Sequence, residues 1–267
     1  RRTSNHWLRL SKPPMSDSVK NLIKVKNLSF SYGEKLVLSD ININVAEGEV
    51  LGIIGPNGGG KTTFLKILLG LIKGYQGEVS IVCTYGNTNR SHHHCIGYVP
   101  QRPDVNIRFP ATVTDAVEMG LYGLAGVRGI SSEEKDYIQW LIKKTGLEKI
   151  KNRPVGAISG GQLQRTFIAR ALVGKPAVLM LDEPLVGIDQ TGIRQFIDLL
   201  MEIKEDLSLT VVLVSHDFHA VSICSDKVAC LNRTLHFHDN PEKLKREDLT
   251  RTFSCAYEAF HDLDFHI

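Results

Sequence analysis

This sequence has few cysteines and no long apolar run, and each shortage excludes a class of protein. Its 267 residues include five cysteines, which are Cys83, Cys95, Cys224, Cys230 and Cys255. Their odd number and the lack of any C-x-x-C spacing argue against a disulfide framework and a structural zinc site, and favour a reducing compartment. No apolar stretch reaches the ~18–20 residues that span a bilayer. We therefore expect a globular chain that does not itself cross a membrane.

Net charge is also nearly absent once the first residues are set aside. The formal net charge is +3, but residues 1–14 contribute four basic residues and no acidic one. Residues 15–267 then hold 28 of the 32 basic residues against 29 acidic ones. A body without a basic excess does not predict nucleic-acid binding. We expect residues 1–18 to be a disordered extension ahead of the folded domain.

Hydrophobic periodicity predicts an α/β fold. Apolar and polar residues alternate over 28–32 and 41–45, which is typical of half-buried antiparallel strands. Short continuous apolar runs predict buried strands at 50–54, 177–181, 210–214 and 227–231, and further short strands are expected within 79–100. Helical spacing is found at 62–71, 112–152 and 193–203. Strands that alternate with helices form a mainly parallel sheet with helices on both faces.

A glycine-rich loop follows the predicted strand at 50–54. It has the pattern G-x-x-x-x-G-K-[ST] and comprises Gly55, Pro56, Asn57, Gly58, Gly59, Gly60, Lys61 and Thr62. Glycines let the backbone curl so that its N–H groups surround a phosphate, and the start of the next helix adds a positive dipole. Lys61 can reach the β- and γ-phosphates, and the Thr62 hydroxyl can bind Mg²⁺. The loop therefore predicts a nucleoside triphosphate site.

Two acidic residues, Asp182 and Glu183, end the predicted strand at 177–181. The carboxyl end of a parallel strand lies near the ligand crevice of such a sheet. Asp182 is expected to hold Mg²⁺ through water, and Glu183 to act as the general base that polarises the attacking water. On its own such a pair could also be a helix cap, but together with the phosphate loop it predicts hydrolysis.

A segment of small residues, Ile158-Ser159-Gly160-Gly161-Gln162, separates the phosphate loop from Asp182. Ser159 is a good helix N-cap, and the N–H groups at the start of a helix can bind an anion. The helix is expected to bury a stripe made of Leu163, Phe167, Ile168 and Leu172. With this segment the chain resembles the ATPase subunits of ABC transporters, and the resemblance covers nearly all of residues 22–250.

The resemblance implies a role for each residue of the site. The implied catalytic residues are Lys61, Glu183 and His216, the last through a contact with the γ-phosphate and water. The implied nucleotide-binding residues are Tyr32, which stacks on adenine, the loop 55–62 with Thr63, Gln101, Ser159, Gly160, Gly161, Gln162, and Asp189 of the inter-subunit loop. Thr62, Gln101 and Asp182 are the implied Mg²⁺ residues. For His216 a structural histidine, and for Tyr32 a simple strand aromatic, remain alternatives.

The resemblance also implies an architecture and partners. The fold is that of a P-loop NTPase of the ABC ATPase type, with a mainly parallel sheet core, an antiparallel β subdomain and a helical subdomain at about 102–165. The ATPase domain is expected at 19–245 and a C-terminal helical tail at 246–267. Each ATP is sandwiched in a head-to-tail homodimer that works with membrane permease subunits and a solute-binding protein. The implied location is peripheral, on the cytoplasmic face of the plasma (inner) membrane.

The transported solute is suggested by residues 98–123, YVPQRPDVNIRFPATVTDAVEMGLYG. This stretch is similar to the ATPases of bacterial importers for zinc, manganese and iron. Phe109-Pro110 within it is a candidate surface for coupling to the membrane partner. The alternatives are an importer for another solute and a soluble ABC ATPase that acts on ribosomes or DNA, although such proteins usually carry two cassettes or a long coiled coil.

Several histidines invite a reading as a metal site. His92-His93-His94-Cys95 has ligand types that suit zinc or copper. Consecutive residues of an extended segment point to opposite faces, however, so a solvated turn is the favoured interpretation. His236 and His238 share one face of a predicted strand, for which a partly exposed strand is the favoured interpretation.

Overall fold

The computed structural model describes residues 21–82, 95–101, 110–125 and 129–253. The predicted extension at 1–18, the histidines at 92–94, and Cys83, Phe109 and Cys255 lie outside the described residues. The predicted boundaries of the helical subdomain and of the C-terminal tail stay predictions.

The described residues form one mixed sheet of six strands in the order β5-β6-β7-β3-β8-β9. Its strands are β3 Val50–Ile54, β5 Ile96–Val99, β6 Val178–Asp182, β7 Thr210–Ser215, β8 Lys227–Asn232 and β9 Thr234–Asp239. All neighbours are parallel except β8 and β9. Every residue of β3, β6 and β7 is buried, because both faces of the sheet are covered. The loop after β3 therefore leaves the middle of the sheet.

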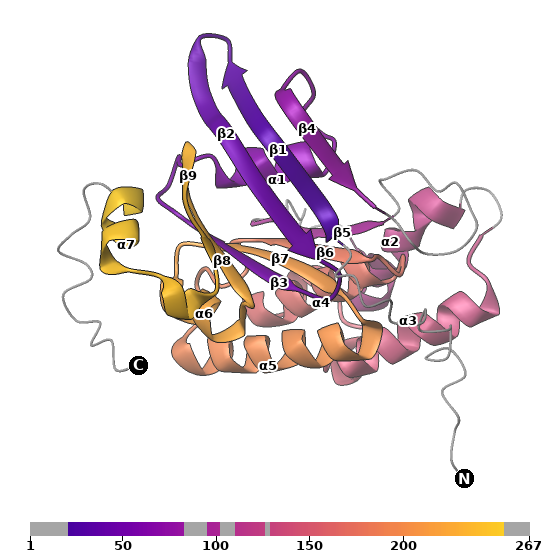
Figure 1. The fold of residues 1–267 in the computed structure, drawn as a ribbon. Helices are drawn as coiled ribbons and strands as arrows, with labels where there is room; N and C mark the ends of the chain where they lie inside the picture. The colour runs from indigo at the N-terminus through magenta and orange to yellow at the C-terminus, as the bar shows by residue number, and fades with distance from the viewer. Residues whose placement is uncertain (1–20, 83–94, 102–109, 126–128, 254–267) are drawn as a thin grey trace.

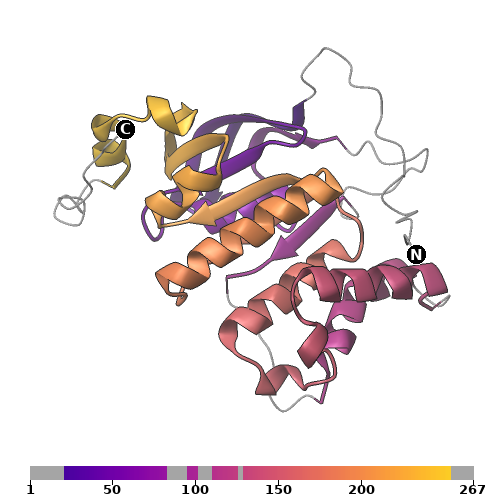
Figure 2. The ribbon, with the colours of Figure 1, turned by 90° about the horizontal axis from the view of Figure 1, so that it is seen from below.

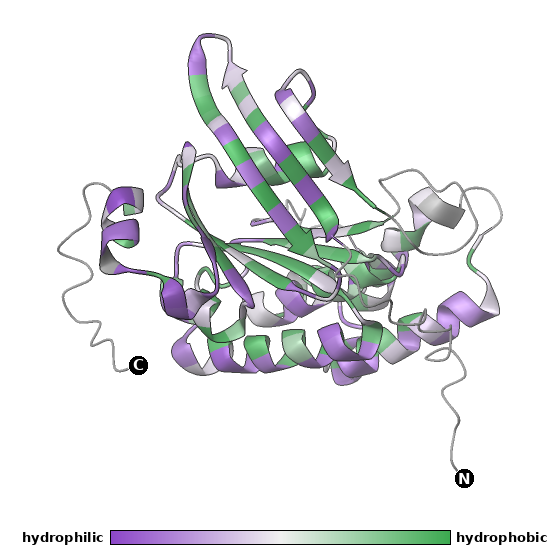
Figure 3. Ribbon diagram, viewed as in Figure 1, coloured by the Kyte–Doolittle hydropathy of each residue, from purple (hydrophilic) through white to green (hydrophobic). Residues whose placement is uncertain are grey.

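A second sheet of three antiparallel strands stands on top of the first in Figure 1. It contains β1 Asn21–Tyr32, β2 Lys35–Ala46 and β4 Gln76–Ile81, in the order β2-β1-β4. Gly33 turns the chain between β1 and β2 with a φ of 57°. Figure 3 shows alternating hydropathy along these strands and mostly apolar colour along the central strands of the larger sheet. Burial alternates over 41–45 as predicted, but the alternation over 28–32 fails at its end, where Tyr32 is exposed.

Two hydrophobic cores lie on opposite faces of the larger sheet. Val50 and Ile54 pack into one core, while Leu51 and Ile53, whose side chains point the other way, pack into the other. The second core also takes in the antiparallel sheet and α1 Lys61–Leu68, so α1 lies between the two sheets. The sheet thereby receives helices on one face and a helix plus a sheet on the other.

The first core is covered by six helices of the described chain. They are α2 Val113–Ala125, α3 Ser132–Lys144, α4 Gly160–Leu172, α5 Gln190–Leu207, α6 Phe218–Cys224 and α7 Arg246–Phe253. In Figure 2 the magenta to salmon helices α2–α4 gather at one edge of the sheet, and the orange helix α5 lies across its face. Short 3₁₀ turns at Glu148–Ile150, Val155–Ala157 and Pro241–Lys243 join them.

The stripe predicted on α4 is only partly correct. Ile168 and Leu172 are buried as expected, but Leu163 and Phe167 are only half-buried. The C-terminal half of the helix carries the packing: a Cβ added at Gly97 of β5 would meet the Ala171 carbonyl oxygen at 2.5 Å. The first turns of α4 therefore stand clear of the sheet.

Cysteine pairing also differs from the expectation. Cys95 is disulfide-bonded, whereas Cys224 and Cys230 are free and buried. Sequence spacing could not show this, because a disulfide depends on which residues the fold brings together.

Among the described helices, none combines the length and the apolar character needed to cross a bilayer.

Candidate active site

The phosphate loop is shaped by close contacts that only glycine permits. Gly55 lies so near β8 that an added Cβ would sit 1.9 Å from the Leu231 carbonyl oxygen. Gly60 has a φ of 97°, and its Cβ would sit 2.7 Å from Cδ2 of Leu38. The loop is thus packed against the antiparallel sheet on one side and β8 on the other.

The turn between β8 and β9 holds the loop from outside. The Arg233 amide donates to the Gly59 carbonyl oxygen over 2.9 Å, and the Ser39 amide donates to the Arg233 carbonyl oxygen over 2.8 Å. This chain of backbone hydrogen bonds connects β2, the turn and the phosphate loop. The loop therefore keeps its shape through backbone contacts that sequence motifs do not reveal.

Lys61 begins α1 and folds back over the loop. Its Nζ donates to the carbonyl oxygens of Gly55 over 2.8 Å and Pro56 over 3.1 Å, and lies 3.5 Å from Oε1 of Glu183. The side chain is only 6% exposed. Burial lowers the pKa of Lys61, and the nearby charge of Glu183 opposes that shift. The site thus contains a buried cation that is held by the phosphate loop and lies beside Glu183.

Asp182 ends β6 directly beside the start of α1. Its Oδ1 lies 3.4 Å from Oγ1 of Thr62, and its Oδ2 lies 3.5 Å from the hydroxyl of Tyr98. Burial raises the pKa of Asp182, as does the charge of Glu183, while the Thr62 hydrogen bond and Lys61 oppose the change. Burial and the neighbouring Asp182 raise the pKa of Tyr98 to about 12. A buried carboxylate next to a hydroxyl is a donor set that suits a hard cation such as Mg²⁺.

Glu183 lies between a cation and a histidine. Its Oε2 is 2.6 Å from Nδ1 of His216 and also accepts the His216 backbone amide at 3.2 Å. The residue has a left-handed φ of 50°, and its own amide donates to the Val214 carbonyl oxygen over 2.8 Å. Such a strained conformation in a non-glycine residue is found mostly at functional sites. The His216 side chain is 58% exposed, so it is no packed core histidine.

The signature segment forms an open helix start. The Ser159 hydroxyl accepts the Gln162 amide, and the Gln162 side chain accepts the Ser159 amide. A Cβ added at Gly160 or Gly161 would meet no atom within 4 Å. Across the described chain, no hydrogen bond or ion pair joins residues 159–162 to the phosphate loop. The structure therefore joins Lys61, Thr62, Asp182, Glu183 and His216 into one site and leaves this segment apart from them.

Three other predicted residues lie outside this cluster as well. The ring of Tyr32 contacts that of Phe30 edge-on, with centroids 4.8 Å apart, and is 53% exposed. Gln101 follows β5 and is exposed. Asp189 is exposed and caps α5 by accepting the Gly192 amide at 2.8 Å.

Sequence reasoning missed Tyr98 as a residue of the site. Its position on β5, paired in register with Met180 of β6, brings its hydroxyl to Asp182. The only signal available was its place three residues before Gln101.

His236 and His238 of β9 are both half-buried, as expected for a partly exposed strand. Within the described ranges, no group of three His, Cys, Asp or Glu side chains is arranged to hold a metal ion.

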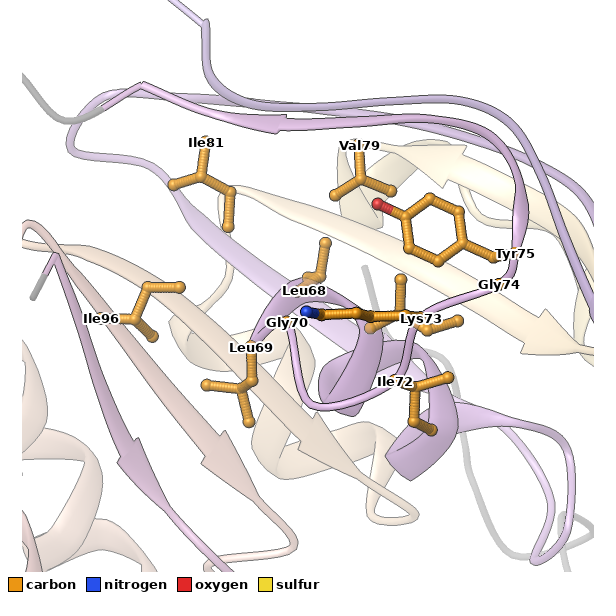
Figure 4. A pocket seen from close by; sticks show the side chains of 11 residues that line it. Leu68, Leu69, Gly70, Ile72, Lys73, Gly74, Tyr75, Val79, Ile81 and Ile96 are labelled. Carbon is orange, nitrogen blue, oxygen red and sulfur yellow. The ribbon is translucent and has the colours of Figure 1, made fainter. Parts of the chain in front are cut away.

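A separate cavity of about 410 Å³ lies beyond the far end of α1 (Figure 4). Its wall is mostly apolar and comes from the end of α1, the loop after it, β4 and β5. The Lys73 and Tyr75 side chains reach across it from the loop. Leu71, next to the lining residue Ile72, is 66% exposed, and Val82 after β4 is 41% exposed. This region is an apolar surface distinct from the phosphate site.

Comparison with known families agrees with the geometry. Residues 38–186 match the family model described as "ABC transporter". A "probable metal transport system ATP-binding protein" of Thermotoga maritima is 39% identical, over 87% of this chain and 90% of that protein. The zinc uptake system ATP-binding protein ZurA of Listeria monocytogenes is 38% identical, over 82% and 86%. The manganese transport system ATP-binding protein MntB of the same organism is 36% identical, over 85% and 93%.

Solved structures share the same fold. CbiO1 of Clostridium perfringens, part of the ABC transporter complex cbiONQ, superposes with a TM-score of 0.74 at 30% identity, covering 86% of this chain and 93% of that one. The ADP conformation of MJ1267, an ATP-binding cassette, gives a TM-score of 0.73 at 23% identity, covering 89% and 96%. The mixed sheet, antiparallel sheet and helices therefore have the arrangement of an ATP-binding cassette.

Proposed function

Because this chain belongs to the ABC transporter ATPase family, we propose that it is the ATP-hydrolysing subunit of an importer for a divalent metal ion. The observation that carries the ATPase assignment is the convergence of Lys61, Asp182, Glu183 and His216 around the phosphate loop. The metal assignment rests on the relatives, whose names specify metal, zinc and manganese transport. Zinc, manganese and iron remain the candidate cargoes.

The phosphate loop grips the triphosphate of ATP. Its backbone N–H groups and the first turn of α1 surround the β-phosphate, and Lys61 exchanges the Gly55 and Pro56 carbonyls for phosphate oxygens. Phosphate oxygens are the stronger partners because they carry charge. The exposed ring of Tyr32 stacks on adenine.

Thr62, Asp182 and Gln101 would hold Mg²⁺. Oγ1 of Thr62 and Oδ1 of Asp182 already lie 3.4 Å apart. Because Asp182 is buried, a cation that neutralises its charge is favoured there. Bound there, Mg²⁺ would offset the negative charge on the β- and γ-phosphate oxygens.

Glu183 and His216 act on the attacking water. The Glu183 carboxylate, held through Oε2 by His216, accepts a proton from a water placed in line with the γ-phosphate and releases it to solvent after turnover, while His216 orients that water and the γ-phosphate. Water oxygen bonds to phosphorus as the bond to the β–γ bridging oxygen breaks, and ADP and phosphate leave.

The open turn at Ser159, Gly160 and Gly161 binds the γ-phosphate of an ATP held by a second copy of the chain. Two observations support this role: both glycines face open space, and the turn is exposed. Two ATP molecules then close a head-to-tail homodimer, in which Asp189 lies at the interface. Hydrolysis reopens the dimer.

The moving dimer drives permease subunits on the cytoplasmic face of the plasma membrane, with a solute-binding protein that delivers the metal ion. The apolar surface formed by the cavity at the end of α1, Leu71 and Val82 is a contact for a permease segment. It flanks β5, which leads to Gln101 and then to Pro110.

Glu183→Gln tests the ATPase proposal. The amide keeps the size of the side chain but cannot take the proton, so hydrolysis should fall by about 100-fold or more, while ATP binding persists and ATP-bound dimers accumulate. Phosphate release measures hydrolysis, and light scattering measures the ATP-bound dimers. Glu205→Gln, on an exposed position of α5, is the matched control.

Near-normal turnover by Glu183→Gln would remove Glu183 as the base. A protein that stays monomeric with ATP would overturn the shared-site dimer. The cargo is tested separately, by uptake of zinc, manganese and iron in a strain that lacks this chain; unchanged uptake of all three would contradict metal import.

A further inference from the structure

Gln164 connects the signature helix to the turn that carries Glu183. It lies on α4 five residues after the N-cap Ser159, and its side-chain amide donates to the carbonyl oxygen of Pro184. The contact is partly buried, so water competes with it only in part. Gln164 and Pro184 belong to different functional segments: Gln164 lies on the helix that Ser159 begins, and Pro184 directly follows Glu183.

The carbonyl of Pro184 is a hydrogen-bond acceptor in the turn that directly follows Glu183. Glu183 is held in its left-handed conformation on one side by the hydrogen bond from its amide to Val214. Pro184 has no N–H, so its carbonyl is the only backbone group through which this residue can be fixed. Leu185, directly after it, is buried in the core, and the chain becomes exposed only from Val186 onward, which is 46% exposed. The hydrogen bond from Gln164 therefore reaches the turn that directly follows the catalytic residue Glu183.

The helix α4 is suited to transmit a pull to this turn. At 1.5 Å per residue, Gln164 lies about 7.5 Å along the axis from Ser159. Its far end is anchored by the buried residues Ile168, Ala169 and Leu172, while its first turn is exposed. A tilt of the exposed end about that anchor moves Gln164 with it.

We propose that Gln164 is a positioning residue that couples the two ATP sites of the closed homodimer. In one protomer, Ser159 contacts the ATP held by the partner, whereas Glu183 hydrolyses the ATP held by its own phosphate loop. Gln164 makes the position of Glu183 depend on whether the first of these contacts has formed. Hydrolysis at one site then requires ATP at both. This inference rests on the proposed function.

Gln164→Met tests the coupling because it keeps the length of the side chain and removes the amide. Hydrolysis is measured against ATP concentration, together with ATP binding to the isolated subunit and thermal unfolding. Gln195→Met, on an exposed position of α5, is the matched control. We expect a Hill coefficient clearly above 1 for the unmodified protein and for the control, and a value near 1 for Gln164→Met. Its maximal rate should fall about fivefold to tenfold, the size of one lost hydrogen bond, with ATP binding and unfolding temperature nearly unchanged.

Gln164→Glu is a second variant, and the coupling predicts how its activity ranks against that of Gln164→Met. Its carboxylate would face the Pro184 carbonyl, so it should lose more activity than Gln164→Met. The coupling is overturned by any of three results. They are an unchanged Hill coefficient in Gln164→Met, a Hill coefficient near 1 in the unmodified protein, and a loss of maximal rate or cooperativity in Gln195→Met equal to that in Gln164→Met. Dimer formation by Glu183→Gln with ATP is measured first: its failure overturns the proposed function, whereas a dimer with unaltered cooperativity overturns only this inference.

Discussion

At the scale of single residues, the site holds charges that burial disfavours. Burial lowers the pKa of Lys61 and raises the pKa of Asp182, so each group loses some preference for its charged form. Glu183 lies 3.5 Å from Lys61 and has a strained backbone. A fold selected for stability alone would avoid such an arrangement, and a site for phosphate and a cation needs it. The cost falls on the residues of the candidate site.

Tyr32 offers the sharpest prediction for a single residue. Its ring is half exposed and touches only the edge of Phe30 in the described contacts. Tyr32→Ala should weaken ATP binding by ~1–3 kcal/mol, the usual value of base stacking, and leave the maximal rate of hydrolysis unchanged. The half-saturating ATP concentration checks this.

Tyr32→Phe is the control, because it keeps the aromatic face and removes only the hydroxyl. It should behave as the unmodified protein does. If the alanine variant had an unchanged half-saturating concentration, adenine stacking on Tyr32 would be wrong and Tyr32 would be only a strand aromatic.

At the scale of the elements, the start of α2 is stabilised by a carboxylate. Oδ2 of Asp115 accepts the Thr112 amide at 2.8 Å and the Thr112 hydroxyl at 2.7 Å. These hydrogen bonds favour the ionised form, so the pKa of Asp115 is lowered. A pKa that is lower in the folded state stabilises the fold above the unfolded value, near 3.9, and this stabilisation is lost as the pH falls through the folded value.

Asp115→Ala should therefore reduce the free energy of unfolding by about 1 kcal/mol at pH 7, as for other lost caps. The difference from the unmodified protein should shrink as the pH falls below about 4 and the carboxyl group becomes protonated. Urea unfolding at several pH values measures it. Asp136→Ala, on the exposed face of α3, is the control for removal of a helix carboxylate. An equal loss with Asp115→Ala at every pH would contradict the assignment to ionisation.

Elements that local chemistry specifies could be predicted from the sequence. The apolar runs of β3, β6 and β7 are buried strands because both faces of the sheet are covered. Gly146, with a φ of 73°, follows the end of α3, where a left-handed glycine commonly ends a helix. Asn240 followed by Pro241 has the chemistry of a helix start, and it caps a single 3₁₀ turn ahead of α7.

Features that depend on tertiary contact could not be predicted in this way. Leu163 fits the apolar stripe of α4, but the helix meets the sheet only with its later turns. Tyr98 reaches Asp182 and Gln164 reaches Pro184 because separate elements lie side by side. Motifs identify the chemical groups of the site, whereas the residues that position those groups need coordinates.

At the scale of the whole molecule, α1 connects two surfaces. Its first residue, Lys61, lies in the phosphate site, and its last turn contributes Ile67 and Leu68 to the cavity in Figure 4. Between these ends the helix is packed between the two sheets, with Phe64 and Leu65 fully buried. One buried helix thus has its first residue in the phosphate site and its last turn at the apolar surface.

Leu71→Asp tests whether that surface binds the permease. Leu71 is 66% exposed, so a charge there should change the free energy of unfolding by no more than about 0.5 kcal/mol. It would have to lose its water on entering an apolar interface, which is costly. We expect the isolated subunit to hydrolyse ATP normally, while co-purification with the membrane subunits and metal uptake are lost. Ile223→Asp, at a 62% exposed position on α6, is the matched control and should retain both. Full uptake with Leu71→Asp would remove this surface from the interface, and an equal loss with Ile223→Asp would show that any added surface charge has the same effect.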